Sequence, residues 1–326
     1  MRAAIITAHA SPPAAADRPR PAPADREALV AVTAAPIVPL DLLCASGASY
    51  FGAPPVPYVP GVQGVGRVVY SSALPVGSRV WFPTSAGMRP GDGSMAELAV
   101  APEEDLVVLP DGTDDALAAA LGTSAIAAWM ALTWRAALQA GEQVLVLGAG
   151  GVVGQVAVQL AKRLGARRVV GAARSGGARE RARTAGADAV VALSDDDEPT
   201  TLASRMAEAC DGPVDVVVDP LCGVPSTAAA TLLGRRGRLV NFGSSAGEVA
   251  SYSSAHLRSH TAAILGYTNN DITTGQRRDA LQAVLRHSIE TGLSVAHEVV
   301  ALEDVSSAWA RQAAGTADRR LVLRIS

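Results

Sequence analysis

The feature that most constrains the fold is a glycine-rich turn joining an apolar strand pattern directly to a helical pattern. Residues 144–147 read Val-Leu-Val-Leu, the turn follows, and an amphipathic helical pattern begins at Val152. Glycines at such a turn permit the tight bend, the approach of a pyrophosphate and close helix–strand packing. We expect the first helical amides to hold the pyrophosphate. The expected binding residues are Gly148, Ala149, Gly150, Gly151, Val152, Val153 and Gly154.

The glycine spacing departs from the strict G-x-G-x-x-G form, because Val153 stands where the last glycine of that form belongs. Glycine spacing alone is weak support, so the surrounding pattern matters more. The alternative at this stage is a glycine-rich turn in an α/β domain that binds no nucleotide. The strong strand before the turn and the strong helix after it favour dinucleotide binding.

From Gln143 onward, strand and helix patterns alternate, which predicts a parallel sheet covered on both faces. The nearly all-apolar segment 214–218 is typical of a central strand in such a sheet. Strands are predicted at 143–147, 168–172, 189–192, 214–218, 238–242 and 262–265. Helices are predicted at 152–164, 177–185, 199–209 and 225–233, with a further helix at 276–291 and a last strand at 320–325.

The first 110 residues have a different sequence pattern, in which short apolar runs are separated by proline and glycine. That punctuation predicts a β-barrel or sandwich. Its strands are expected near 2–7, 28–33, 66–70, 79–82, 96–100 and 106–109. The proline-rich stretches 11–24 and 51–61 are expected to be loops. Helices are expected after Asp114-Asp115 and over 124–137.

Composition excludes several classes of function. The formal net charge of -3 indicates neither a nucleic-acid partner nor an anionic-membrane partner. The sequence has no uninterrupted run of about 18 apolar residues, so no membrane span is expected. Three scattered cysteines, Cys44, Cys210 and Cys222, predict no disulfide framework and suit a reducing, cytoplasmic compartment.

The end of the second predicted strand bears on which nicotinamide nucleotide binds. An NAD site usually places Asp or Glu there to hold the ribose hydroxyl, whereas this chain continues with Arg174-Ser175 and carries no acid. Arg174, Ser175 and Arg179 are candidates for holding a 2′-phosphate, which predicts NADPH as the cofactor. The alternative is that both arginines are ordinary solvated charges at a helix start.

At this point the chain resembles the medium-chain dehydrogenase/reductase superfamily, and within it the zinc-free quinone oxidoreductase group similar to zeta-crystallin. The resemblance covers nearly the whole chain. It rests on Asp41-Leu42-Leu43 with Gly47 and Tyr50, the proline-rich segment 54–61, the segment 93–97, the turn described above, and the segments 214–219 and 237–243.

The resemblance implies an α/β protein with a GroES-like β-barrel and a doubly wound Rossmann domain. The expected boundaries are 1–115 for the GroES-like domain, 116–268 for the Rossmann domain and 269–326 for a segment returning to the first domain. It also implies a homodimer formed through the strand near 262–265. The nicotinamide is expected against the loops after the fifth and sixth strands, at Asn241, Phe242, Gly243, Gly266, Tyr267 and Thr268.

Zinc-dependent relatives carry a Gly-His-Glu segment, which here reads Gly61-Val62-Gln63, and residues 83–102 lack the cysteines of a structural zinc loop. Catalytic zinc needs about three N, S or O ligands from the protein, so no metal is expected.

Hydride transfer without zinc favours an acceptor that delocalises negative charge, namely a quinone or an α,β-unsaturated carbonyl compound. Tyr50 is the candidate acid, with an alternative role as a wall of the pocket. Two further hypotheses stay open. One is an enoyl reductase acting on acyl thioesters of the polyketide or fatty-acid type. The other is a cofactor-binding protein without turnover.

Overall fold

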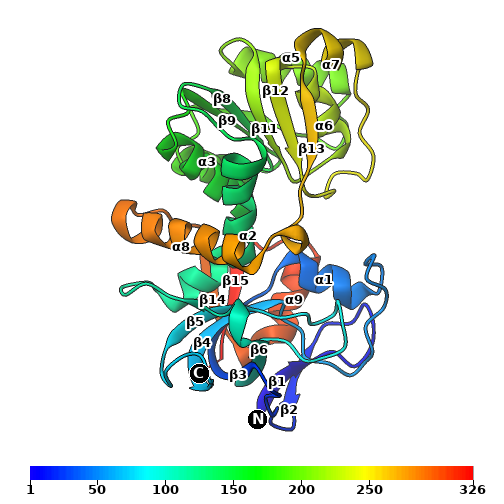
Figure 1. The fold of residues 1–326 in the computed structure, drawn as a ribbon. Coiled ribbons are helices and arrows are strands. Elements are labelled where there is room, and N and C mark those ends of the chain that lie inside the picture. The colour runs from blue at the N-terminus through cyan, green and yellow to red at the C-terminus, as the bar shows by residue number, and fades with distance from the viewer. Residues whose placement is uncertain (326) are drawn as a thin grey trace. The chain divides into compact units, whose positions relative to one another are not determined.

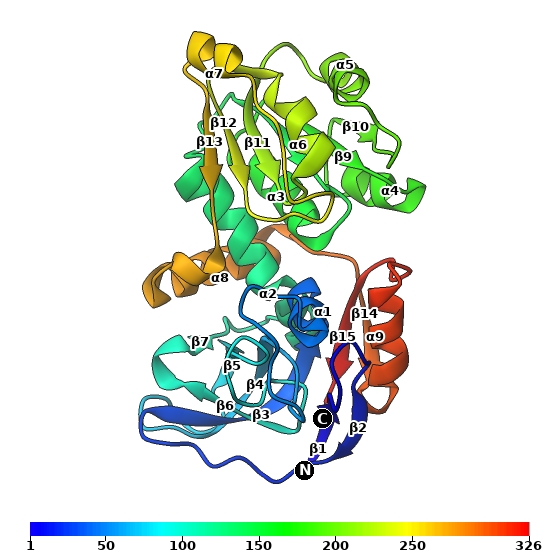
Figure 2. The same cartoon turned by 90° about the vertical axis from the view of Figure 1, so that its right-hand side faces the viewer.

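Six parallel strands form one sheet in the order β10-β9-β8-β11-β12-β13, as the alternating pattern predicted (Figure 1). Helices α3 and α4 pack together, as do α5 and α6, and helices lie on both sides of the sheet (Figure 2). The strands are β8 Gln143–Leu147, β9 Arg168–Ala173, β10 Ala189–Ala192, β11 Val214–Asp219, β12 Leu233–Asn241 and β13 Ala263–Gly266. The helices are α3 Val152–Arg163, α4 Gly176–Thr184, α5 Pro199–Ala209, α6 Gly223–Ala230 and α7 Ser254–His260.

This computed structural model describes residues 1–325. The chain divides into two units. The parallel-sheet unit comprises Ser124–Thr273, and the mixed-sheet unit comprises Met1–Thr123 together with the C-terminal segment from Thr274. Each unit has its own apolar core, built around Leu145, Val170 and Val217 in the first and around Val30, Phe82 and Leu323 in the second. Burying each such side chain contributes about 1.5–3 kcal/mol.

The mixed-sheet unit is built on a seven-stranded sheet in the order β14-β15-β3-β4-β5-β7, with β6 also pairing with β3. The C-terminal strand enters this sheet by pairing antiparallel with β3, so that Val322 lies opposite Pro36. The strands are β3 Glu27–Pro36, β4 Gln63–Tyr70, β5 Arg79–Pro83, β6 Leu98–Pro102, β7 Val107–Val108, β14 His297–Ala301 and β15 Arg320–Arg324; β1 Arg2–Ile5 and β2 Ala14–Asp17 form a separate pair. The helices are α1 Pro39–Ser46, α8 Thr274–Thr291 and α9 Val305–Ala313.

Several local predictions were wrong. The stretch 11–24 was expected to be a loop, yet Ala14–Asp17 is a strand, because its prolines flank the ladder rather than interrupt it. The predicted helix 225–233 ends at Ala230, and β12 begins at Leu233, five residues before the expected strand. Residues 234–238 are glycine and arginine only, and Arg236 has φ 59°. Glycine is depleted in strands and the segment has no apolar run, so no strand was predicted there.

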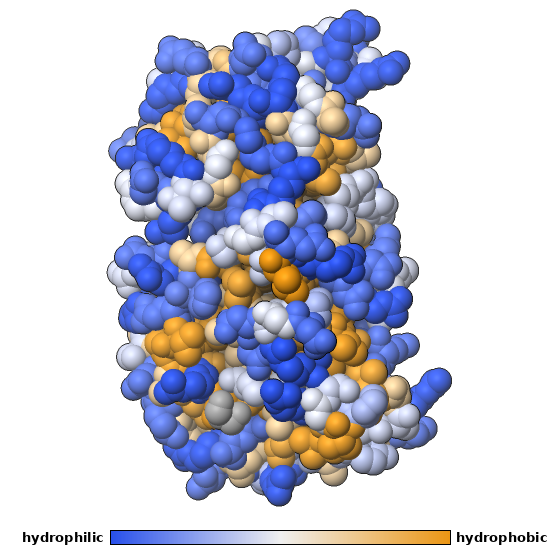
Figure 3. Space-filling view, turned by 90° about the vertical axis from the view of Figure 1, so that its left-hand side faces the viewer, coloured by the Kyte–Doolittle hydropathy of each residue, from blue (hydrophilic) through white to orange (hydrophobic). Residues whose placement is uncertain are grey.

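Helix α2, Asp115–Met130, continues into a π-helix at Ala131–Arg135 and is broken at Gly122, where φ is 31° and ψ is -128°. Among residues 1–325, the segment Asp115–Arg135 alone is long and apolar enough to cross a membrane, and 67% of its most apolar window is buried inside the protein. Such burial is typical of a core helix. Figure 3 shows one face of the molecule, on which hydrophobic residues form separate patches among hydrophilic ones.

Candidate functional site

The carboxyl ends of the parallel strands meet at one edge of their sheet, and the strand order reverses there between β8 and β11. Open α/β sheets bind ligands in the crevice at such a reversal. The turn after β8 lies directly against the loop after β11: a Cβ added to Gly148 would lie 3.2 Å from Leu221 and 3.4 Å from Pro220. The glycine-rich turn therefore stands where a dinucleotide site is expected.

The glycines of the turn differ in whether, and why, the structure requires glycine at that position. Gly148 adopts φ +65°, a left-handed conformation that favours glycine. A Cβ on Gly150 would lie 2.5 Å from the Ala178 carbonyl oxygen, and one on Gly154 would lie 2.5 Å from the Ala149 Cα. These two positions therefore let helices α4 and α3 approach the turn closely. A Cβ on Gly151 would meet only the Gly148 carbonyl oxygen, at 3.4 Å, so packing does not require glycine there.

Gly151 is the N-cap of α3, with φ -77° and ψ 169°. It is exposed, and Val152 and Val153 are half-buried, so the start of the helix lies at the surface of its unit. The early amides of a helix have no intrahelical acceptor, and they carry the positive end of the helix dipole. A glycine-rich turn at the start of a helix is the kind of site at which a diphosphate binds.

The residues after β9 form a basic border to this edge. Arg174 pairs with Asp195 at 3.2 Å, and the Arg179 guanidinium donates to the Arg174 carbonyl oxygen. Ser175 is the N-cap of α4, and its hydroxyl accepts the Ala178 amide at 3.1 Å. The structure therefore places all three predicted phosphate-contacting residues at the loop after β9 and the start of α4. Both Arg174 and Ser175 already have partners there.

Sequence reasoning missed Arg181. Its Nε donates to the Gly150 carbonyl oxygen at 3.0 Å, which ties α4 to the glycine turn. In the sequence it is one of several arginines in a helix, and only the fold shows which of them faces the turn.

The loop after β11 was also missed. Asp219 is fully buried, and its Oδ1 accepts the amides of Leu221 and Cys222, both at 2.9 Å. Its Oδ2 accepts a hydrogen bond from Asn241 Nδ2 at 2.9 Å. One carboxylate therefore fixes two neighbouring loops of the edge. The signal that was available was the acidic residue closing an apolar strand.

The residues expected near the nicotinamide lie at the ends of β12 and β13. Asn241 Nδ2 also donates to the Gly243 carbonyl oxygen at 3.0 Å, and the Tyr267 amide donates to the Asn241 carbonyl oxygen at 2.9 Å. The Phe242 and Tyr267 rings meet edge to face, with centroids 6.1 Å apart. Gly266 and Thr268 are exposed beside them. All six predicted residues thus share one end of the sheet.

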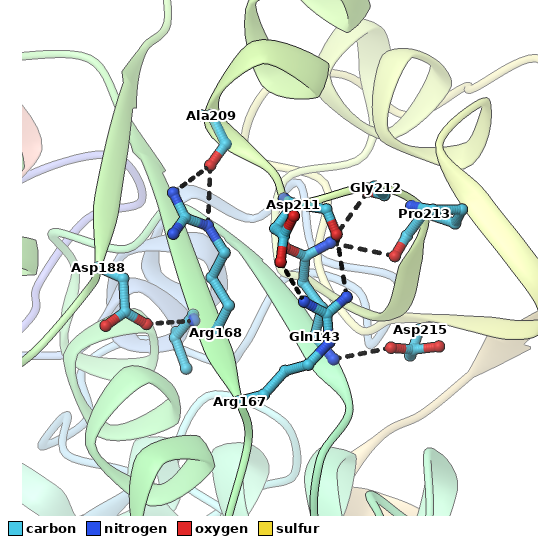
Figure 4. A network of polar contacts seen from close by, with 10 residues as sticks. Gln143, Arg167, Arg168, Asp188, Ala209, Asp211, Gly212, Pro213 and Asp215 are labelled. Atoms are coloured by element: carbon cyan, nitrogen blue, oxygen red, sulfur yellow. Dashed lines mark hydrogen bonds and ion pairs between the residues drawn. The ribbon is translucent and has the colours of Figure 1, made fainter.

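The opposite edge of the sheet is held together by side chains (Figure 4). Gln143, at the start of β8, donates through Nε2 to the carbonyl oxygens of Gly212 and Pro213 at 3.0 Å, and its Oε1 accepts the Asp211 amide at 2.7 Å. Arg168 donates twice to the Ala209 carbonyl oxygen. The amino ends of neighbouring strands are therefore fixed by internal hydrogen bonds.

In the mixed-sheet unit, Asp41 lies in helix α1. Pro39 at the first helical position and Asp41 at the third favour a helix start, and this signal was overlooked. Asp41 accepts the amides of Val38 and Val62, both at 2.9 Å. Burial raises its pKa to about 6, although these hydrogen bonds and the positive charge of Arg320 oppose the shift.

Arg320, on the C-terminal strand, is the buried cation near Asp41. It donates to the Ile37 carbonyl oxygen at 2.9 Å, and burial lowers its pKa to about 10. The attraction between these two buried charges, and the hydrogen bond from Arg320 to Ile37 just before α1, help to hold α1 on the sheet of its own unit. Asp41 therefore has a structural role, because it accepts the amides of Val38 and Val62.

Tyr50 follows α1 and is 79% exposed, and its ring lies 4.2 Å from that of Phe51. Leu43 and Val56 are also exposed nearby in the sequence. This stretch of the mixed-sheet unit therefore presents apolar and aromatic side chains together with one phenolic hydroxyl.

Val62 and Gln63, which stand where zinc-dependent relatives carry His and Glu, are part of the buried core. Val62 is buried and has no donor atom for a metal. Gln63 is fully buried, and its Oε1 accepts the Trp81 indole N–H at 3.0 Å and the Thr123 amide at 2.7 Å. Its Nε2 approaches the Ala119 carbonyl oxygen at 3.5 Å.

Gln63 thus joins both ends of the break in α2. A Cβ on Gly122 would lie 2.6 Å from the Gln63 Cδ, so glycine is required beside it. Within residues 1–325, no group of three or more His, Cys, Asp or Glu side chains could hold a metal ion. The residues present do not fit a zinc site.

Comparisons with known proteins agree with this geometry. The alcohol dehydrogenase GroES-like domain family matches residues 24–111, and the zinc-binding dehydrogenase family matches residues 152–286. A quinone oxidoreductase of Lama guanicoe is 30% identical over 230 residues, which cover 69% of this chain and 66% of that protein. The chain belongs to the medium-chain dehydrogenase/reductase superfamily, in its quinone oxidoreductase group.

The human quinone oxidoreductase is 36% identical over 149 residues, and this match spans 44% of each chain, less than half of either protein. The crystal structure of the quinone oxidoreductase of Thermus thermophilus, which was also solved with NADPH, has a TM-score of 0.80 and 25% identity over the full length of both chains. The family and the fold expected from the sequence are therefore confirmed.

Proposed function

We propose that this protein is an NADPH-dependent oxidoreductase that transfers hydride, without zinc, to a quinone or an α,β-unsaturated carbonyl compound. One observation carries the proposal. The glycine turn presents helix-start amides at the strand-order reversal, and the neighbouring strand β9 ends in Arg174-Ser175 rather than in an acid. The NADPH complex of the Thermus thermophilus relative supports the choice of nucleotide.

The 2′-phosphate is assigned to Arg174, Ser175 and Arg179. Guanidinium groups bind phosphate through several charge-assisted hydrogen bonds, and Arg174 before α4 and Arg179 within it supply them. The solvent exposure of Arg174, 68%, leaves its guanidinium accessible to a ligand. The diphosphate is assigned to the turn from Gly148 to Gly154, and the nicotinamide to the ends of β12 and β13.

NADPH, when bound, supplies the hydride. The protein orients the acceptor, and we assign to Tyr50 the hydrogen bond to the oxygen on which negative charge develops. Addition of hydride and one proton turns a quinone into a hydroquinone, or an enone into a saturated carbonyl compound. Acceptors of these classes delocalise the charge, and Val62 and Gln63 supply no metal site that would stabilise it instead.

The proposal is tested by NADPH oxidation with 1,4-benzoquinone, 9,10-phenanthrenequinone, simple enones and enoyl thioesters. We expect turnover with quinones or enones. Turnover confined to enoyl thioesters would instead indicate an acyl enoyl reductase, and tight NADPH binding without any turnover would indicate a cofactor-binding protein. Both results would contradict the proposed substrate class.

Two variants test the assigned residues. Arg174→Ala is expected to weaken NADPH binding more than NADH binding, and an equal loss for both would refute the phosphate assignment. Tyr50→Phe keeps the ring and removes the hydroxyl. We expect it to lower kcat about tenfold to a hundredfold. An unchanged kcat would leave Tyr50 only the role of a wall of the pocket.

We further propose a homodimer in a reducing, cytoplasmic setting. Strand β13 is at one edge of its sheet, and its residues 263–265 are only half-buried, so its outer side can pair with a second copy. Sedimentation of the purified protein checks this, and a monomer at micromolar concentration would contradict it.

A further inference from the structure

The loop after β10 brings a run of three aspartates, Asp195 to Asp197, to the border of the proposed phosphate pocket. Asp195 Oδ1 lies 3.2 Å from Arg174 Nη1, in an ion pair whose side chains are 68% and 86% exposed for Arg174 and Asp195. The guanidinium assigned to the 2′-phosphate is therefore already in contact with a carboxylate from the next strand's loop.

The three aspartates have different surroundings. Asp197 accepts the Ser194 amide at 2.8 Å and pairs with Arg205 at 2.5 Å, and its side chain is only 7% exposed. Asp196 is exposed, and its backbone amide donates to the Ser194 hydroxyl. The ion pair with Arg174 belongs to Asp195. Asp197 maintains the shape of the loop, and Asp196 carries the same charge as Asp195 one residue further along.

A carboxylate in this position acts against a bound phosphate. Asp195 approaches one nitrogen of Arg174, so the remaining N–H groups of the guanidinium are available to a ligand. If the phosphate displaces the carboxylate, the ion pair is lost. If the carboxylate stays, it lies within a few ångströms of a group carrying about two negative charges. In either case NADPH loses affinity, whereas NADH, which has no 2′-phosphate, does not.

We propose that Asp195 is a specificity-determining residue that lowers the preference of this site for NADPH over NADH. The inference rests on the proposed function, because it requires Arg174 to meet the 2′-phosphate. Exposed ion pairs are weak, so the effect is a moderate one, about twofold to fivefold in the dissociation constant.

The test compares Asp195→Asn with the matched control Asp196→Asn in the full-length protein. Dissociation constants for NADPH, NADH, 2′,5′-ADP and 5′-AMP are measured by calorimetry at low salt. We expect Asp195→Asn to tighten NADPH and 2′,5′-ADP about twofold to fivefold and to leave NADH and 5′-AMP unchanged. Asp196→Asn should give a clearly smaller gain.

Three results would overturn the inference. Weaker NADPH binding by Asp195→Asn would mean that the carboxylate positions Arg174 for the phosphate. An equal gain from Asp196→Asn would mean that only the total charge matters. A gain shared by NADH would mean that the effect has nothing to do with the 2′-phosphate.

The Arg174→Ala background separates this inference from the proposed function. There the gain from Asp195→Asn should be smaller than in the wild type, because no ion pair with Arg174 remains to be broken and only the repulsion between Asp195 and the phosphate is removed. If the wild-type protein binds NADPH and Asp195→Asn changes nothing, this inference alone fails. If the wild-type protein binds no nicotinamide nucleotide, the proposed function fails and the inference fails with it.

Discussion

The carboxyl edge of the parallel sheet and the Gly61–Gln63 segment of the mixed sheet differ in how they are filled. At the sheet edge, Gly151 is exposed at the N-cap of α3, and Val152 and Val153 at the start of the helix are half-buried. At the other position, Val62 and Gln63 are buried, and the Gln63 amide group is hydrogen-bonded to Trp81 and Thr123. The turn proposed to bind the nucleotide therefore lies partly at the surface, whereas the segment that stands where zinc-dependent relatives carry Gly-His-Glu belongs to the core.

The largest expected effect comes from filling the glycine turn. Gly154→Val should destabilise the protein by about 3 kcal/mol or more, because the new Cβ would lie 2.5 Å from the Ala149 Cα and the backbone cannot move away. Nucleotide binding should be lost with it. Urea unfolding and NADPH titration measure the two effects.

Gly151→Ala sharpens this comparison. Its Cβ would meet only the Gly148 carbonyl oxygen at 3.4 Å, so the loss of stability should stay below about 1 kcal/mol, the scale of an N-cap change. NADPH affinity should nevertheless fall, because the methyl group stands where the diphosphate approaches. Unchanged affinity in Gly151→Ala would show that the turn does not face the nucleotide.

Removing the buried side-chain amide of Gln63 tests the Gly61–Gln63 segment. Gln63→Ala should cost about 3 kcal/mol, because Trp81 Nε1 and the Thr123 amide lose their acceptor in a buried place. The dissociation constant for NADPH in native buffer should not change. Gln139→Ala is the matched control: Gln139 is exposed and its side-chain amide donates to the nearby Ala137 carbonyl oxygen, so it should cost under about 0.5 kcal/mol. Similar losses in both variants would refute the structural role of Gln63.

Asp41 should make stability depend on pH. Its pKa is about 6 in the folded protein against an ordinary value of 3.8, so the folded state binds the extra proton between these values. The Asp41 contribution is therefore fully present below pH 4 and is lost as the pH rises through 6. It amounts to on the order of 3 kcal/mol.

Other carboxyl groups act in the opposite sense, since hydrogen bonds from Ser71 and Ser72 lower the pKa of Glu103 to about 2. The difference between wild type and Asp41→Asn isolates the Asp41 contribution. Relative to the variant, the wild type should lose stability between about pH 4 and 6.5 in urea unfolding. A constant difference over that range would exclude the raised pKa of Asp41.

A smaller loss of stability than at Gly154, Gln63 or Asp41 is expected at the cap of α4. Ser175→Ala should cost about 1 kcal/mol of stability, because the Ala178 amide loses its acceptor. Ser175→Asp keeps an acceptor at the cap and should keep the stability, yet its charge should weaken NADPH more than NADH. If Ser175→Asp binds both nucleotides as the wild type does, Ser175 lies away from the 2′-phosphate.

The sequence predicted the parallel sheet and its turn because the signals are local. Apolar runs, glycines and helix starts follow one another within the segment from Gln143 to Gly154. The β12 start was mispredicted for a local reason as well, since the charged residues over 234–238 do not resemble a strand.

The interactions that fix the site were less accessible, because they join residues far apart in the chain. Asp41 meets Arg320, Gln63 meets Thr123, and Asp219 meets Asn241 only in the folded protein. Arg181 was hidden among similar residues, and its contact with Gly150 depends on how α4 packs. The spacing of glycines in the sequence indicates where a turn without side chains will form. Which distant side chains contact one another is decided by tertiary packing.

The most direct test of the central claim is a titration of the purified wild-type protein with NADPH and NADH, followed by calorimetry. The account predicts saturable binding with one site per chain and a lower dissociation constant for NADPH. No binding of either nucleotide, or tighter binding of NADH, would contradict it.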